Sequence, residues 1–163
     1  MRLYFLDHEK RTVLSRSLTQ SLRRFWRWLT RSHRLVEQER LPDHELLARF
    51  ILRKDYVRFD KTVKPNAFIP PKNLQLSVTR HLSLTVELIW RAGEEVAAIQ
   101  NLPLHGRADI ECSHVTKLGL IARASPLPTN SNHADIIAWP DDKPAQKLLA
   151  QELAANSTYV SKS

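Results

Sequence analysis

The spacing of the strand-like segments in the second half of the chain most restricts how it can fold. Short apolar runs that favour strands fall at 96–99, 108–115, 118–122 and 134–139, and residues 74–81 alternate apolar and polar side chains. Two parallel strands need a crossover of about a dozen or more residues between them. The gaps between the last four of these runs are shorter. We therefore expect an α+β domain with a small mixed or antiparallel sheet and flanking helices.

Helices are predicted around this sheet from capping residues and apolar spacing. One is expected over 43–54, after Pro42, and a second is capped by Ser83 and ends at Gly93. A third begins at Asp141 or Asp142 and continues to residue 154. Residues 55–73 read as an irregular connection with at most a short edge strand at 67–69. Residues 126–132 read as a loop. A compact domain of 41–156 and a disordered tail of 157–163 follow from this pattern.

Residues 13–38 contain neither Gly nor Pro and have the pattern of a basic amphipathic helix. Its apolar stripe contains Leu14, Leu18, Leu22, Phe25, Leu29 and Val36. Its opposite face contains Arg16, Arg23, Arg24, Arg27, Arg31 and Arg34, and the stripe is flanked by Trp26 and Trp28. We expect residues 1–40 to be a helical arm that precedes the compact domain.

The net charge of +8 is concentrated in that arm. Residues 1–40 contain ten basic and four acidic side chains, which gives +6, whereas residues 41–163 contain fifteen and thirteen, which gives +2. A basic arm on a nearly neutral domain favours nucleic-acid binding, with arginines on phosphates and tryptophans stacked on bases. The alternatives are that residues 14–36 pack on the compact domain, dock on a partner chain or a second copy, or lie on a membrane surface, which the sequence favours less.

Several classes of protein are disfavoured by composition. The only glycines are Gly93, Gly106 and Gly119, so neither a Walker A loop nor a dinucleotide fingerprint can be written. There is no G-x-S-x-G turn of the kind that presents a serine nucleophile. A single cysteine and the lack of a long apolar run or a signal peptide favour a cytoplasmic protein.

Two pairs of potential metal ligands occur at strand-like spacing. Cys112 and His114 share one face of a predicted strand, and His133 and Asp135 share one face of another. If the two strands are neighbours, these four side chains can form a zinc site. The paired-cysteine spacing of recognisable zinc sites is absent, and a buried cysteine more often behaves as a small apolar residue. No cofactor is therefore predicted, with zinc as the alternative.

The same histidine and aspartate are candidates for acid–base chemistry. His133 and Asp135 lie where a loop meets a buried strand, which is a favoured place for functional side chains. Arg80 and His81 lie at the end of the predicted strand 74–81. These residue types suit a small hydrolase or a nucleotidyl-processing enzyme. The alternative is that all four are partly exposed polar residues at strand ends.

Five segments carry a resemblance to other proteins: AFIPP (67–71), SVTRH (77–81), GRADI (106–110), HADIIAWP (133–140) and AQKLLAQELA (145–154). Over residues 43–160 the chain resembles small uncharacterised bacterial proteins encoded among mobile-element or phage-defence genes. The resemblance implies a bacterial accessory protein and no particular activity. Together with the basic arm, it leads us to expect a non-enzymatic, nucleic-acid-associated protein, with an enzyme or a protein-interaction module as alternatives.

Overall fold

The computed structural model describes residues 40–82 and 84–162. The predictions for the arm lie outside these residues: its helix, its six arginines, Trp26 and Trp28, and the contacts expected of 14–36. Residues 40–163 form one compact unit. Within the described ranges, no helix has both the length and the apolar composition needed to cross a membrane.

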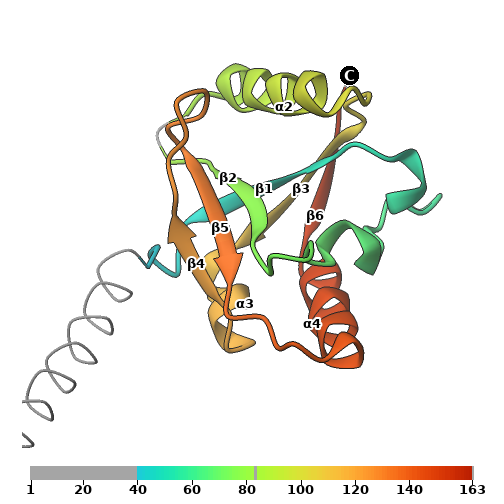
Figure 1. Ribbon diagram of the computed structural model, residues 1–163. Coiled ribbons are helices and arrows are strands. Elements are labelled where there is room, and N and C mark those ends of the chain that lie inside the picture. Colours follow the sequence, from blue (N-terminus) through green and yellow to red (C-terminus); the bar gives the residue numbers. More distant parts are fainter. Residues whose placement is uncertain (1–39, 83, 163) are drawn as a thin grey trace, which may run out of the picture. The chain divides into compact units, whose positions relative to one another are not determined.

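The compact unit is built on one six-stranded sheet in which every neighbouring pair is antiparallel (Figure 1). In the order β4-β5-β2-β1-β3-β6, the strands are β4 (Ile121–Ala124), β5 (His133–Ile137), β2 (Leu76–Arg80), β1 (Leu46–Ile51), β3 (Gly106–Glu111) and β6 (Thr158–Ser161). With the helices described next, this sheet confirms the predicted α+β class.

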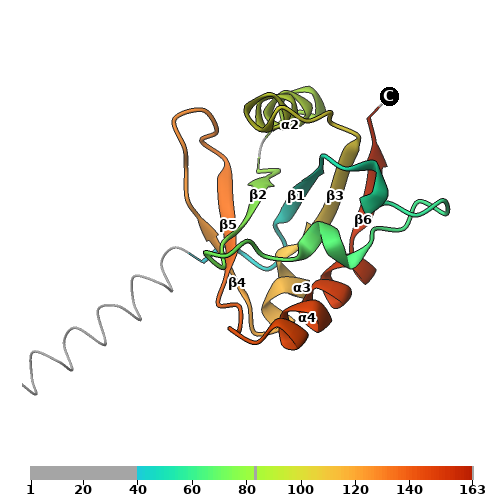
Figure 2. The same cartoon turned by 45° about the vertical axis from the view of Figure 1, so that its right-hand side comes forward.

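Helices cover both faces of the sheet (Figure 2). Helix α2 (Val86–Gln100) lies on one side, and α3 (Cys112–Lys117) and α4 (Lys143–Ala155) lie on the other. The connection after β1 contains two 3₁₀ turns, η1 (Lys54–Tyr56) and η2 (Pro65–Phe68). The predicted start of the last helix is confirmed, because the Asp142 carboxylate caps α4 by accepting from the backbone N–H of Ala145 at 2.9 Å.

Alternation along β1 divides the buried side chains between two clusters. Leu47 and Ile51 contribute to the larger core, which η2 and α4 help to close, whereas Ala48 and Phe50 pack with Ile89 of α2. This division explains why the predicted helix over 43–54 is wrong. A strand buried on both faces presents a continuous apolar run, and such a run cannot be told from a buried helix by periodicity.

Helix α2 is longer than predicted, and the predicted strand at 96–99 is wrong because those residues belong to it. Thr85 is its N-cap, and the helix ends at Asn101, which adopts the left-handed conformation. Gly93 lies inside the helix where it crosses β1. A Cβ there would be 2.8 Å from the Phe50 ring, so this glycine serves close packing and not termination.

Three further expectations are corrected. Residues 67–69 are not an edge strand, because the 3₁₀ turn η2 occupies this region. The Ala67 carbonyl accepts from Arg49 Nε of β1 at 2.9 Å, and Arg49 Nη1 donates to the Ser77 carbonyl at 2.9 Å. The predicted strand 108–115 ends at Glu111, where α3 begins. The tail expected to be disordered forms β6, which pairs with β3 over four residues. A Cβ on Gly106 would be 2.5 Å from the carbonyl oxygen of Val160, so this pairing requires glycine.

Candidate functional site

Polar side chains lie side by side on the α2 face of the sheet, as the strand register shows. Thr79 of β2 pairs with His133 of β5, and Ser77 pairs with Asp135. Asp135 in turn pairs with Arg123 of β4. Directly paired residues on antiparallel strands point to the same face. The prediction that His133 and Asp135 share one face of a strand is therefore confirmed. The neighbouring strands add side chains to this face that the sequence did not indicate.

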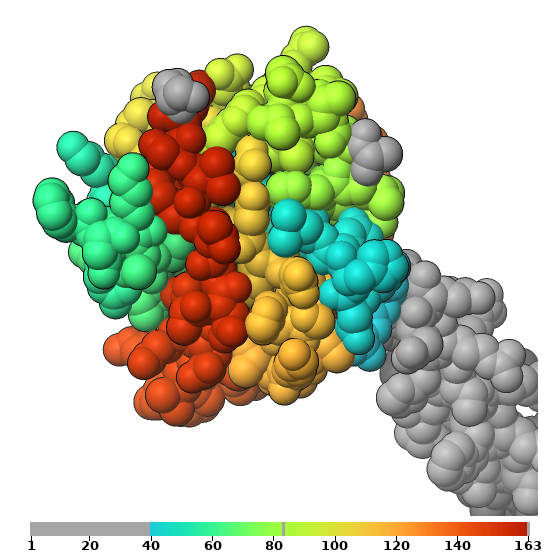
Figure 3. All heavy atoms as spheres, turned by 180° about the vertical axis from the view of Figure 1, so that it is seen from behind, coloured from blue at the N-terminus to red at the C-terminus, as the bar shows by residue number. Residues whose placement is uncertain are grey.

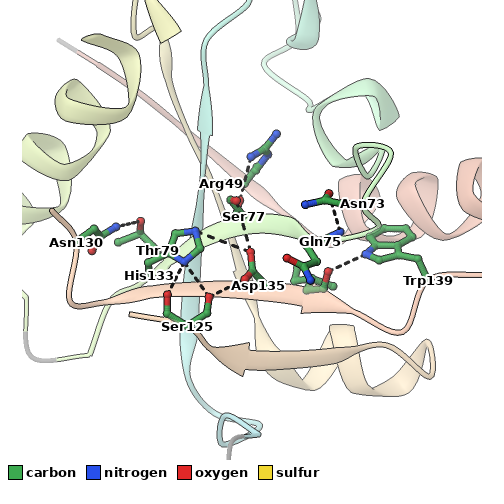
Figure 4. Close-up of polar contacts among 11 residues, drawn as sticks. Arg49, Asn73, Gln75, Ser77, Thr79, Ser125, Asn130, His133, Asp135 and Trp139 are labelled. Atoms are coloured by element: carbon green, nitrogen blue, oxygen red, sulfur yellow. Dashed lines mark hydrogen bonds and ion pairs between the residues drawn. The ribbon is translucent and has the colours of Figure 1, made fainter. Parts of the chain in front are cut away.

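Ser125, His133 and Asp135 form the tightest group on this face (Figure 4). Ser125 Oγ is 2.8 Å from His133 Nδ1 and donates to Asp135 Oδ2 at 2.6 Å. His133 Nδ1 is also 2.8 Å from the carbonyl oxygen of Ser125. Ser77 Oγ donates to Asp135 Oδ1 at 3.5 Å. The exposed fractions of the His133 and Asp135 side chains are only 13% and 10%.

These contacts determine where the protons lie. The Ser125 carbonyl can only accept, so His133 carries a hydrogen on Nδ1 and its Nε2 has the free lone pair in the neutral ring. Ser125 directs its own hydrogen to Asp135 and not to the imidazole. The three side chains are therefore not a serine-nucleophile triad, which requires the histidine to accept from the serine. They fix the tautomer of one histidine, with Nε2 lying 3.8 Å from Asp135 Oδ1.

The structure does not bring Arg80 or His81 into this group. Arg80 Nε and Nη2 donate to the two carboxylate oxygens of Glu45, at 2.5 and 3.0 Å, and this pairing raises the pKa of Arg80. His81 Nε2 is 3.2 Å from an Asp109 oxygen, and Arg107 donates to the same carboxylate at 3.0 Å. Asp109 belongs to β3, which β2 and β1 separate from β5. Arg80 and His81 therefore have structural partners of their own.

The four residues proposed to bind zinc are also separated. Cys112 and His114 lie on α3 and not on a strand, and the preceding strand β3 pairs with β1 and β6 but not with β5. Burial, followed by the nearby Glu45 and Asp43 carboxylates, raises the pKa of the Cys112 thiol to about 12. Across residues 40–82 and 84–162, no three His, Cys, Asp or Glu side chains are arranged to share a metal.

A second candidate site, which sequence reasoning missed, is a basic groove beside β6. Its cavity is about 550 Å³ and is lined by Lys54, Val57, Arg58, Phe59, Lys61, Leu104, His105, Tyr159, Ser161 and Lys162. Four of these side chains are cationic, and none is acidic. Figure 3 shows the segment around residue 60 next to β6 on the surface. The groove thus combines three parts of the chain, 54–61, 104–105 and 159–162, of which the first and the last lie about a hundred residues apart.

The net charge of the compact unit is concentrated in the segment that contributes Lys54, Arg58 and Lys61 to this groove. Residues 53–64 contain five basic and two acidic side chains, which gives +3. The rest of 40–163 contains eleven of each and is neutral. Segment 53–64 therefore accounts for the whole positive excess of the unit. The positive charge of 53–64 could have been found from the sequence, but the larger positive charge of the arm drew attention away from it.

Comparison of the chain with protein-family models, with curated proteins and with solved structures gave no match. The two sites are therefore the basis on which a function can be proposed. One is the group around His133 and Asp135, which can accept a proton. The other is the basic groove, which can bind a polyanion.

Proposed function

We propose that the protein binds nucleic acid through its phosphates, with the basic groove as the contact surface of the compact unit and the arginines of the arm as a second contact. The observation that carries the proposal is the lining of the groove, in which Lys54, Arg58, Lys61 and Lys162 occur without an acidic side chain. The role that fits the resemblance is a non-enzymatic accessory protein of a bacterial mobile-element or defence system, acting in the cytoplasm.

The physical basis is the release of counterions from the phosphate backbone. Each cation that neutralises a phosphate makes the logarithm of the affinity fall by about 0.7 to 0.9 per logarithmic unit of salt. Four groove cations therefore account for a slope of roughly −3 to −4. Lys162 Nζ forms an ion pair with Oε1 of the exposed Glu94 at 2.6 Å, so a phosphate has to compete with that carboxylate for this lysine. The contribution of this lysine is consequently the smallest of the four.

Removing the groove cations is expected to weaken binding and its salt dependence together. In the full chain, Lys54→Gln, Lys61→Gln and Lys162→Gln should lower the steepness of the salt dependence by about 2 to 3, because three phosphate contacts are lost. The measurement is fluorescence anisotropy of a labelled oligonucleotide titrated at several salt concentrations. Arg58 is left intact because its Nη1 supports the hairpin by donating to Thr62 Oγ1 and the Val63 carbonyl.

The matched control removes three exposed cations that do not line the groove, by Arg91→Gln, Lys117→Gln and Lys147→Gln. It has the same net charge as the groove variant and should keep a slope close to that of the parent. Equal slopes for the two variants would contradict the groove as a contact surface. A third variant, with the six arm arginines changed to Gln, measures the contribution of the arm separately.

A second candidate function is acid–base catalysis by His133, in a small hydrolase or nucleotidyl-processing enzyme. The specific observation that favours it is the fixed tautomer, because the Ser125 carbonyl holds the hydrogen on Nδ1 and leaves Nε2 able to take a proton from an attacking water. Asp135 lies beside Nε2 and can stabilise the imidazolium that results. Sequence reasoning identified this pair, but Ser125 became apparent only from the register of β4 and β5.

Substitution of His133 tests this second function. If Nε2 is a general base, His133→Ala should lower the hydrolysis of a phosphodiester, such as bis(4-nitrophenyl) phosphate, by roughly 10²- to 10⁴-fold. His114→Ala, on α3, should leave the rate unchanged. A parent without hydrolysis above background, or a His133→Ala rate equal to that of the parent, would exclude catalysis by this group on phosphodiesters.

A further inference from the structure

The most exposed large apolar side chain among the described residues belongs to Phe59, whose relative exposure is 106%. An exposed aromatic ring loses the favourable free energy that burial would provide. Here the ring lies at the rim of the basic groove, between Arg58 and Asp60 in the chain. An aromatic ring that faces solvent next to a cationic groove is the arrangement with which proteins stack an unpaired base.

A hydrogen-bonded hairpin orders the backbone that carries this ring. Val57 and Val63 form a bridge, and the backbone N–H of Arg58 donates to the Thr62 carbonyl at 2.9 Å. The Lys61 N–H donates to the Arg58 carbonyl at 3.0 Å and so closes the turn that carries Phe59. These bonds order the turn before any ligand binds. A preorganised loop loses little conformational freedom on binding, and binding is stronger for that reason.

The Asp60 carboxylate is directed into the hairpin. Its Oδ1 accepts from the Thr62 backbone N–H at 3.0 Å and from Thr62 Oγ1 at 2.7 Å. These bonds lower the pKa of Asp60, with the backbone bond as the larger cause. The carboxylate is therefore engaged at the turn, next to the ring. Insertion of Phe59 into an anionic membrane would bring the ionised Asp60 carboxylate close to lipid headgroups of the same charge. A base stacked on the face of the Phe59 ring would leave the hydrogen bonds between Asp60 and Thr62 intact.

A second aromatic ring lies inside the groove. Tyr159 of β6 lines it, and its hydroxyl donates to the His105 carbonyl at 2.9 Å, which fixes the ring against the wall. Lys54 and Lys61 line the same cavity. The groove therefore combines cations that can contact a phosphate backbone with two aromatic side chains, Phe59 and Tyr159. In a duplex the bases are stacked and paired with one another, so only a single strand can use the exposed ring.

From these contacts we infer that the groove is a site for single-stranded nucleic acid, in which an unpaired base stacks on Phe59 while the adjoining phosphates contact Lys54, Arg58 and Lys61. This inference rests on the proposed function and narrows it from nucleic acid in general to unpaired strands. Recognition through stacking is tolerant of sequence, since every base has an aromatic face.

The test compares Phe59→Ala and Phe59→Trp with the parent full-length chain on three probes. These are a labelled 12-nucleotide oligothymidylate, a 12-base-pair duplex, and vesicles of phosphatidylcholine and phosphatidylserine. Phe59→Ala should weaken binding of the single strand by roughly 5- to 100-fold, as expected when one base–aromatic stack is lost. It should change duplex binding less than twofold, and Phe59→Trp should restore single-strand binding. Ile99→Ala, at the exposed face of α2, should bind like the parent.

The outcomes separate this inference from the function on which it rests. Because Phe59 is uncharged, Phe59→Ala should leave the salt dependence unchanged, whereas the triple lysine variant of the groove should lower it. If the groove variant lowers the slope but Phe59→Ala leaves single-strand affinity intact, or weakens duplex equally, the stacking inference is overturned and the proposed function stands. If only vesicle binding depends on Phe59, the ring contacts lipid and the inference is overturned. If the parent binds neither oligonucleotide, both proposals fail.

Discussion

Replacing Glu45 by Ala should lower the free energy of unfolding by about 3 to 5 kcal/mol. The Glu45 side chain is 6% exposed and accepts two hydrogen bonds from Arg80, whose side chain is 18% exposed. Removing the carboxylate leaves the guanidinium of Arg80 largely out of water and without its counter-charge. Urea unfolding followed by tryptophan fluorescence measures the loss, which is a large fraction of the roughly 5 to 15 kcal/mol typical of a domain.

Two controls show whether burial is the cause. Glu95→Ala removes a carboxylate that lies 3.9 Å from Arg91 on the exposed face of α2, and it should cost less than about 1 kcal/mol. The double variant Glu45→Met/Arg80→Met replaces both charges with apolar side chains and should recover most of the stability. If Glu45→Ala costs no more than Glu95→Ala, the Glu45–Arg80 pair is not desolvated in solution and does not stabilise the fold through burial.

Phe68→Ala should cost about 3 to 5 kcal/mol of unfolding free energy. Phe68 lies in η2, is 0% exposed and belongs to the larger core, to which Leu153 of α4 also contributes. Truncation removes most of a buried aromatic ring and leaves a cavity where η2 closes that core. Denaturant midpoints at an unchanged m-value give the loss directly. The experiment tests whether the connection after β1 is part of the core and not an accessory loop.

Phe59→Ala is the matched control, because it makes the same substitution in the same connection at a fully exposed ring. It should change the free energy of unfolding by no more than about 0.5 kcal/mol. Similar losses for the two variants would mean that the connection does not pack against the core through Phe68. A small effect of Phe59→Ala also ensures that its effect on binding reports contact with the ligand and not a loss of structure.

Local sequence patterns were sufficient to predict a helix or strand where one of its faces is polar, or where a capping residue marks its start. The alternating residues of β2 and the start of α4, with Asp141 or Asp142 as its cap, were recognised from the sequence. Local patterns failed for β1, whose two faces are both buried, and for 96–99, where α2 continues through Gly93. They failed also for β6, because a short polar segment becomes a strand only through its pairing with β3.

The candidate sites divide in the same way. The proximity of His133 and Asp135 follows from their interval of two residues on a strand, so the sequence was enough. Ser125 joins them through the pairing of β4 with β5, and the proposed zinc ligands separate because α3 follows β3. In the basic groove, Lys54 and Lys61 come from the connection after β1, whereas Lys162 comes from the end of the chain. No local pattern relates these segments.

By itself, the sequence determined the class of fold, the uneven distribution of charge and the shared face of His133 and Asp135, because each depends on spacing or composition within a short stretch of chain. Only the tertiary structure decided the strand order, the partners of Arg80 and His81, and the groove beside β6. These features arise from hydrogen bonds and packing between distant segments, and their free energy depends on which surfaces meet and not on any one segment alone.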